Sequence, residues 1–145
     1  MIDAAAFYKG RDTEYASELT EEIRANSENT IAKVNELLER SGFKSIDSVD
    51  SGWRPRAVNA ATSNAGAHSN HITGQACDLP DPDRAFATWC VDNLDVLGSI
   101  GLWMEDPRWT KTWVHVQTIP PKSGRRVYIP SLAAASDPTF PVTWS

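Results

Sequence analysis

Apolar residues recur at helical spacing from residue 20 to residue 40. Thr20 suits the N-cap of a helix, Glu21 and Glu22 suit the positive end of the helix dipole, and Gly42 follows as a stop signal. The pattern predicts an amphipathic helix, and its apolar positions are Ile23, Ile31, Val34, Leu37 and Leu38.

A second helical pattern begins near Asp81-Pro82-Asp83. Asp81 is a candidate N-cap, Pro82 fits the first helical position, and Gly98 marks the expected end. One face of this helix would carry Phe86, Trp89, Cys90, Leu94 and Leu97. We expect both helices to serve as scaffold.

The remaining pattern is typical of short strands and a loop. Residues 100–105 and 112–117 favour strands, and Asp106-Pro107-Arg108 punctuates the gap between them, which predicts an antiparallel hairpin. Residues 126–129 suit one more short strand. Residues 59–70 are rich in Asn, Ser, Ala and Gly, which is typical of a loop that connects elements or carries function.

Length and charge narrow the possible functions. The 145 residues are about the size of one compact domain, so we expect a single domain over residues 1–145, with no assigned role for the tail at 131–145. The formal net charge is -5, and neither half of the chain has the basic excess that nucleic acid or an anionic membrane attracts. The apolar stretches are too short for a transmembrane helix, and the first residues lack the features of a secretory signal. We therefore expect no nucleic-acid partner, no membrane insertion and synthesis in the cytoplasm.

The two cysteines are Cys77 and Cys90. Disulfides are rare in the cytosol, so we expect two free, buried thiols. Because side chains alternate along a strand, Cys77 would point away from the face that Asp78 occupies.

Three side chains form a candidate metal site. His71 and Asp78 lie in the segment Ser69-Asn70-His71-Ile72-Thr73-Gly74-Gln75-Ala76-Cys77-Asp78, and His115 lies in Trp113-Val114-His115-Val116-Gln117. Two imidazoles and one carboxylate are ligands that zinc (Zn2+) accepts, and a three-ligand site leaves a tetrahedral position open for water. Such an open position is typical of catalytic zinc.

These segments resemble the zinc D-Ala-D-Ala carboxypeptidases and L-alanyl-D-glutamate endopeptidases. Ser51-Gly52-Trp53-Arg54 resembles the family's Ser-Gly-Tyr-Arg-like element, residues 69–78 fit its Ser-x-His-x-x-Gly-x-Ala-x-Asp element at every fixed position, and Trp113-Val114-His115 resembles its late His element. The match covers residues 51–117, and Trp103-Met104-Glu105-Asp106-Pro107 is similar to the phage and prophage branch. The resemblance implies a small α+β fold of the hedgehog and D-Ala-D-Ala-peptidase type, with an antiparallel sheet packed against two main helices.

The resemblance also implies residue roles. His71, Asp78 and His115 would hold zinc, Arg54 would face the substrate carbonyl or carboxylate, and Ser69 would bind substrate or orient the ligand loop. As an alternative, Arg54 pairs with a surface carboxylate. His68 should be exposed, since the family's ligand position falls on His71.

The general base departs from the family pattern. Many members place a Glu three residues before the last His, or a His two residues before it, and this chain has Thr112 and Trp113 there. If Glu105 lies opposite Trp113 in the hairpin, it shares a sheet face with His115 and would take the proton from the attacking water. A slip of one residue would favour Asp106 instead.

The expected function is therefore zinc-dependent hydrolysis of amide bonds in the stem peptides of bacterial peptidoglycan. A phage or prophage lysis endopeptidase would be made in the cytoplasm and would act on the cell wall after release; trimming of a terminal D-Ala is the other open specificity. The alternative is a non-catalytic virion or assembly protein that keeps the zinc-peptidase fold. Four tryptophans could line the cleft, although such residues are more often core: Trp53, Trp103, Trp109 and Trp113.

Overall fold

The computed structural model describes residues 1–62, 65 and 68–130. The tail at 131–145 lies outside the described residues. The helices are α1 (Ala4–Tyr8), α2 (Arg11–Glu14), the 3-10 turn η1 (Ala16–Glu18), α3 (Glu21–Ser41), α4 (Arg56–Ala61), α5 (Ala85–Asp92) and α6 (Leu94–Ile100). The strands are β1 (Ala76–Pro80), β2 (Trp103–Glu105), β3 (Trp113–Gln117) and β4 (Val127–Tyr128). The chain is thus an α+β protein, as predicted.

The four strands form one mixed sheet in the order β1-β3-β2-β4. β3 pairs antiparallel with both β1 and β2, which confirms the predicted hairpin, whereas β4 pairs parallel with β2. The expectation of a wholly antiparallel sheet is therefore wrong at β4. After β3 the chain crosses to the other edge of β2 and forms β4 there. β4 therefore runs in the same direction as β2 and opposite to β3.

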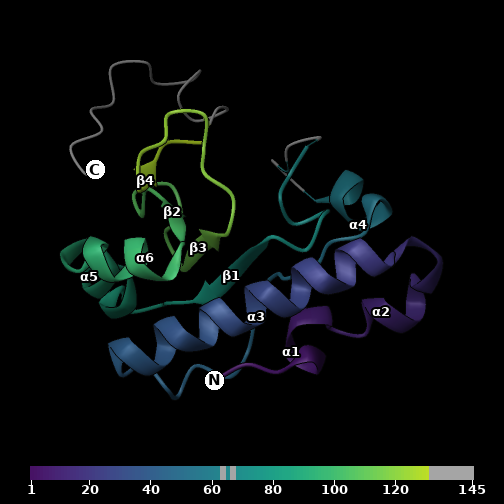
Figure 1. The fold of residues 1–145 in the computed structure, drawn as a ribbon, viewed down its shortest axis with the longest axis horizontal. Helices are drawn as coiled ribbons and strands as arrows, with labels where there is room; N and C mark the ends of the chain where they lie inside the picture. The colour runs from purple at the N-terminus through teal and green to yellow at the C-terminus, as the bar shows by residue number, and fades with distance from the viewer. Residues whose placement is uncertain (63–64, 66–67, 131–145) are drawn as a thin grey trace.

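α3 confirms the first predicted helix. The Thr20 hydroxyl accepts a hydrogen bond from the Ile23 amide at 3.1 Å, and Gly42 ends the helix in the left-handed region at φ +81°. α3 runs across the molecule below the sheet in Figure 1. α1 and α2 lie on the side of α3 that faces away from the sheet, and α5 and α6 lie beside the strands at the left of the view.

The second predicted helix is wrong in its bounds and is split in two. The Asp81 carboxylate accepts from the amides of Phe86 and Ala87 at 3.0 and 2.9 Å, so it does cap the helix, but from a turn that contains Pro82. The chain breaks between α5 and α6 at Asn93, whose side-chain amide donates to the Trp89 carbonyl at 2.8 Å.

The expected end at Gly98 is also wrong. This glycine lies inside α6, and Gly101, at φ +91°, takes the left-handed cap position instead.

The expected loop at 59–70 is partly helical, because α4 extends to Ala61. The first helical amide, that of Arg56, donates to the Glu18 carboxylate at 2.9 Å. This capping group lies 38 residues away in the sequence. Local composition therefore gives no sign of the helix.

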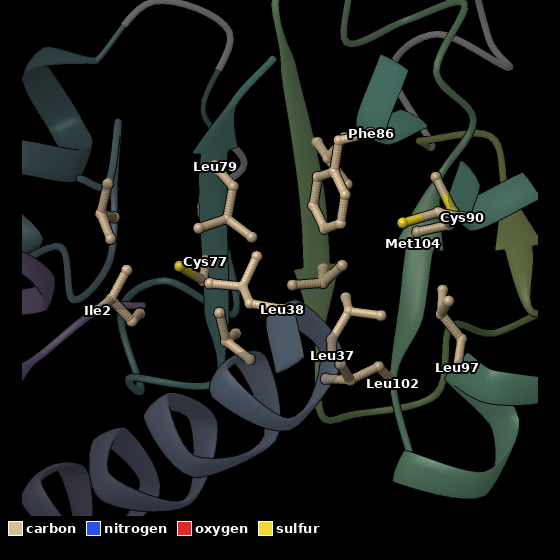
Figure 2. Packing of buried hydrophobic residues seen from close by; sticks show 14 of the residues in the cluster. Ile2, Leu37, Leu38, Cys77, Leu79, Phe86, Cys90, Leu97, Leu102 and Met104 are labelled. Carbon is tan, nitrogen blue, oxygen red and sulfur yellow. The ribbon is translucent and has the colours of Figure 1, made fainter. Parts of the chain in front are cut away.

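The apolar core lies between the sheet and the second half of α3. Figure 2 shows Leu38 of the helix near Cys77 and Leu79 of β1, and Leu37 near Leu102, with Phe86 and Met104 farther along the sheet. The cluster of buried residues also includes Cys77, Cys90, Trp53, Leu97 and Leu102. Both cysteines are free and buried, as expected.

The core expectation is confirmed for one of the four tryptophans. Trp53 is a core residue with 1% exposure, whereas Trp103, Trp109 and Trp113 are partly buried.

Within the described part of the chain, the helices are all too short or too polar to cross a membrane.

Candidate metal centre

Asp78 and His115 are brought together by the register of the sheet. The two residues are direct partners in the β1–β3 pair. The Asp78 amide donates to the Ser51 carbonyl at 2.7 Å, and its carbonyl accepts from the Asp50 amide at 2.8 Å, so its backbone points away from β3. Asp78 and His115 are therefore a pair without mutual backbone hydrogen bonds, in which facing side chains are closest. The distance from His115 Nδ1 to Asp78 Oδ1 is 2.8 Å.

His71 reaches the same carboxylate from a turn that packs against α3. Gly74 turns the chain at φ +76°, and an added Cβ there would lie 2.4 Å from Ser27 Oγ, so the close approach requires glycine. Thr30 of α3 donates from its hydroxyl to the Gly74 carbonyl at 2.8 Å. The turn places His71 Nε2 3.2 Å from Asp78 Oδ2.

The three side chains could hold a metal ion. One donor atom from each of His71, Asp78 and His115 lies within 4.8 Å of the others. The side chains are only 4, 13 and 8% exposed, so the donors are largely removed from bulk water. Desolvation of this kind strengthens the attraction between a carboxylate and a cation.

The orientation of His71 is fixed by a backbone carbonyl. Nδ1 of His71 lies 2.8 Å from the Gly52 oxygen, which can only accept, so in the neutral ring Nδ1 carries the proton and Nε2 has the lone pair. That lone pair is directed toward Asp78. A carbonyl or carboxylate on the outer nitrogen is the usual support of a metal-binding histidine.

His115 has a different arrangement, in which Nδ1 faces Asp78 and Nε2 lies 2.8 Å from Gln117 Oε1. If Nε2 donates to Gln117, Nδ1 presents a lone pair to the Asp78 oxygen. Two lone pairs at 2.8 Å repel each other unless a cation, either a proton or a metal ion, lies between them.

Electrostatics in the metal-free site favour a charged pair. Burial lowers the pKa of His115, but the charge of Glu105 and then the hydrogen bond with Asp78 outweigh it, and the pKa rises from 6.5 to about 9. Burial raises the pKa of Asp78, but the two histidines outweigh it and hold that pKa well below its ordinary value of 3.8. The site is therefore built to keep Asp78 ionised beside a positive charge.

Glu105 lies beside His115, although the expected register is wrong by two residues. Met104 pairs with Val116, so continuing this ladder places Glu105 opposite His115 rather than Trp113. A shift of two residues keeps the same sheet face. Glu105 Oε1 is 3.9 Å from His115 Nε2, and the Glu105 side chain is 21% exposed, so it borders both the site and solvent.

Asp106, the alternative base, is committed elsewhere. It is fully buried, and Arg108 donates from Nη2 at 2.6 Å and from its backbone amide at 2.9 Å. The carboxylate thus stabilises the turn after β2. The geometry favours Glu105 over Asp106 as the acid beside His115.

Arg54 lies beside the carboxylate of Asp78. Its Nη2 is 3.9 Å from Asp78 Oδ2 and donates to Ser51 Oγ at 3.2 Å, and its Nη1 donates to Asn59 Oδ1 at 3.1 Å. The Arg54 side chain is 9% exposed. The alternative that Arg54 pairs with a surface carboxylate is wrong, because its acidic partner is the candidate ligand itself.

Ser69 orients the ligand loop, since its hydroxyl accepts from the His71 amide at 3.2 Å. His68 is exposed, as expected.

Sequence reasoning missed Gln117 and Tyr128, both of which lie beside His115. The available signal was strand alternation, because Gln117 follows His115 by two residues and shares its face.

Comparison of the chain with protein-family models, curated protein sequences and solved structures finds no match in any of the three. The resemblance to zinc peptidases therefore depends on the residue pattern alone, and the geometry adds three side chains that could hold a metal ion.

Proposed function

We propose that the protein is a zinc-dependent peptidase that hydrolyses amide bonds in peptidoglycan stem peptides. The observation that carries this proposal is the convergence of His71, Asp78 and His115 from a turn and two strands onto one point, with donor atoms within 4.8 Å. The family resemblance supplies the substrate class, and the geometry supplies a place for the metal.

The donor set fits zinc. Donors about 2.0–2.1 Å from a tetrahedral zinc ion are roughly 3.3 Å apart. The 3.2 Å between His71 Nε2 and Asp78 Oδ2 is close to this value, and the 2.8 Å between His115 Nδ1 and Asp78 Oδ1 needs to open only slightly. Two imidazoles and one carboxylate leave the fourth position for solvent or substrate.

Bound zinc would supply a Lewis acid that activates water near neutral pH and polarises the scissile carbonyl. Glu105, which is partly exposed and 3.9 Å from His115, would accept a proton from the nucleophile and pass it to the leaving amine. Ser51 and Asn59 use two of the five N–H groups of Arg54, and the others would face a substrate carboxylate or oxyanion. Ser69 would keep the ligand loop in place.

We further propose a phage or prophage lysis role. A lysis enzyme cuts cross-linked wall, which favours an endopeptidase over a carboxypeptidase that trims terminal D-Ala. The enzyme would be synthesised in the cytoplasm and reach the wall after release. The alternative is a non-catalytic virion or assembly protein, which the presence of Thr112 and Trp113 at the family's base positions favours.

One experiment tests catalysis separately from metal binding. Purified protein loaded with zinc is incubated with peptidoglycan, and the release of new amino groups is compared for the wild type, Glu105→Gln and Glu28→Gln. Glu28 is exposed on α3 and serves as the matched control. We expect the wild type and the control to cleave, and Glu105→Gln to lose about 100-fold or more of the rate while retaining zinc. Stoichiometric zinc without amine release by the wild type would favour the virion alternative.

Metal binding itself is tested by mass spectrometry of the native protein. We expect one zinc ion in the wild type and none in His71→Ala, since loss of one of three ligands removes the site. Equal binding by the variant would contradict the ligand assignment.

A further inference from the structure

Gln117 lies next to His115 on the sheet face that carries the candidate site. It follows His115 by two residues in β3, its side chain is almost fully buried, and it lies opposite Trp103 of β2. A buried amide has to satisfy both its oxygen and its nitrogen. The partners of this amide decide which way it points.

The nitrogen end of the amide is identified by a backbone carbonyl. Nε2 of Gln117 lies 2.7 Å from the oxygen of Ile119, which can only accept a hydrogen bond. The opposite orientation would place two oxygens against each other at this distance. The amide oxygen therefore faces His115.

The amide oxygen receives two donors. Nε2 of His115 lies 2.8 Å from Gln117 Oε1, and the Tyr128 hydroxyl of β4 donates to the same oxygen. Because Oε1 cannot donate, the proton of His115 has to be on Nε2 when the ring is neutral.

We infer that Gln117, held by Ile119 and Tyr128, is a positioning residue that fixes the Nε2-protonated tautomer of His115 and so directs Nδ1 to the metal. This inference rests on the metal site of the proposed function but not on peptide hydrolysis. The same hydrogen bond has a second effect on Glu105, whose oxygen is 3.9 Å from His115 Nε2. With Gln117 occupying that N–H, the Glu105 carboxylate is left available for the reaction.

The test uses the zinc-loaded wild type together with Gln117→Leu, Gln117→Glu and the control Gln75→Leu. Gln75 is a partly buried glutamine whose side-chain oxygen accepts from the Thr73 hydroxyl rather than from His115. Long-range nitrogen–proton NMR correlations report which ring nitrogen of His115 binds the metal. Competition with a chelator gives the zinc affinity of each variant.

We expect the wild type to show a metal-bound Nδ1 and a protonated, slowly exchanging Nε2. Loss of an outer hydrogen bond typically weakens metal binding about 10–100-fold, and we expect this loss in Gln117→Leu. Gln117→Glu retains an acceptor for Nε2 and should recover most of the affinity, whereas Gln75→Leu should match the wild type. Faster exchange of the Nε2 proton in Tyr128→Phe, but not in Tyr8→Phe, would support the part assigned to Tyr128, because the buried Tyr8 hydroxyl makes no hydrogen bond in the described part of the chain.

A wild-type His115 that binds zinc through Nε2 overturns the inference, whether or not the variants fold. So does a folded Gln117→Leu whose affinity equals that of the wild type. Zinc bound through Nδ1 without peptidoglycan cleavage keeps the inference and overturns only the peptidase proposal. A wild type that binds no zinc overturns both.

Discussion

The raised pKa of His115 predicts how the metal-free protein responds to pH. The group has a pKa of 6.5 in its ordinary state and about 9 in the folded protein. Folding therefore favours the protonated ring. The contribution of His115 to stability is fully present below pH 6.5, and it is lost as the pH rises through the folded value of about 9.

The magnitude follows from the size of the shift. A difference of one pKa unit is about 1.36 kcal/mol, so the shift from 6.5 to about 9 corresponds to roughly 3 kcal/mol of unfolding free energy. The His115 side chain is 8% exposed, so screening by solvent reduces this value little.

The same proton competes with metal for Nδ1. At pH 7, about two units below the folded pKa, the proton should weaken zinc binding roughly 100-fold relative to its limit at high pH.

Two measurements check the prediction on protein stripped of metal. An NMR titration of the His115 ring should have its midpoint near 9, and urea unfolding should show stability falling between pH 6.5 and 9. Glu105→Gln should lower the midpoint, since Glu105 makes the largest contribution that raises this pKa. A wild-type midpoint at or below 6.5, or a midpoint that the variant leaves unchanged, would refute the electrostatic account of the site.

Three further substitutions test how the fold supports the site. Gly52→Ala should destabilise the protein by about 2 kcal/mol or more, because the new Cβ would lie 2.3 Å from the Phe7 carbonyl oxygen. It should also weaken zinc binding, because the backbone shift would displace the Gly52 oxygen that orients His71. Unchanged thermal unfolding would contradict this. Leu38→Ala should cost about 2–5 kcal/mol in urea unfolding, since the side chain is fully buried, and a loss below 1 kcal/mol would mean that the core collapses around it. Thr20→Ala should cost about 1 kcal/mol through loss of the α3 cap and leave zinc affinity unchanged; a change in zinc affinity would show that the cap acts on the site.

Elements with local signals could be predicted from the sequence. α3 has a cap, an apolar stripe and a glycine stop within one segment, and β2 and β3 have β-branched and aromatic residues around a turn. The division between α5 and α6 could not be predicted, because the break depends on Asn93 bonding to the carbonyl of Trp89. The helix α4 depends on Glu18, a distant residue with no sequence relation to it.

The site shows the same division between local and distant causes. His71, Asp78 and His115 carry a motif, and the sheet brings them together. The position of Glu105 on the face of His115 could be predicted from alternation, even though the assumed register was wrong by two residues. The buried polar residues Ser27 and Thr30 lie on α3 because that part of the helix supports the turn around His71 rather than the apolar core. The spacing of apolar residues along α3 does not predict that these two polar residues are buried.

The bridge between Ser51 and Asp78 has a consequence for self-association. β1 lies at one end of the sheet order, and an open strand edge can pair with another chain and start aggregation. Here the backbone N–H and C=O of Asp78 are already bonded to residues 50 and 51, while β4, at the opposite rim, is only two residues long. Among the described residues, neither rim offers a long free template, and the short segment that carries Arg54 disfavours pairing of another chain with the ligand strand at Asp78.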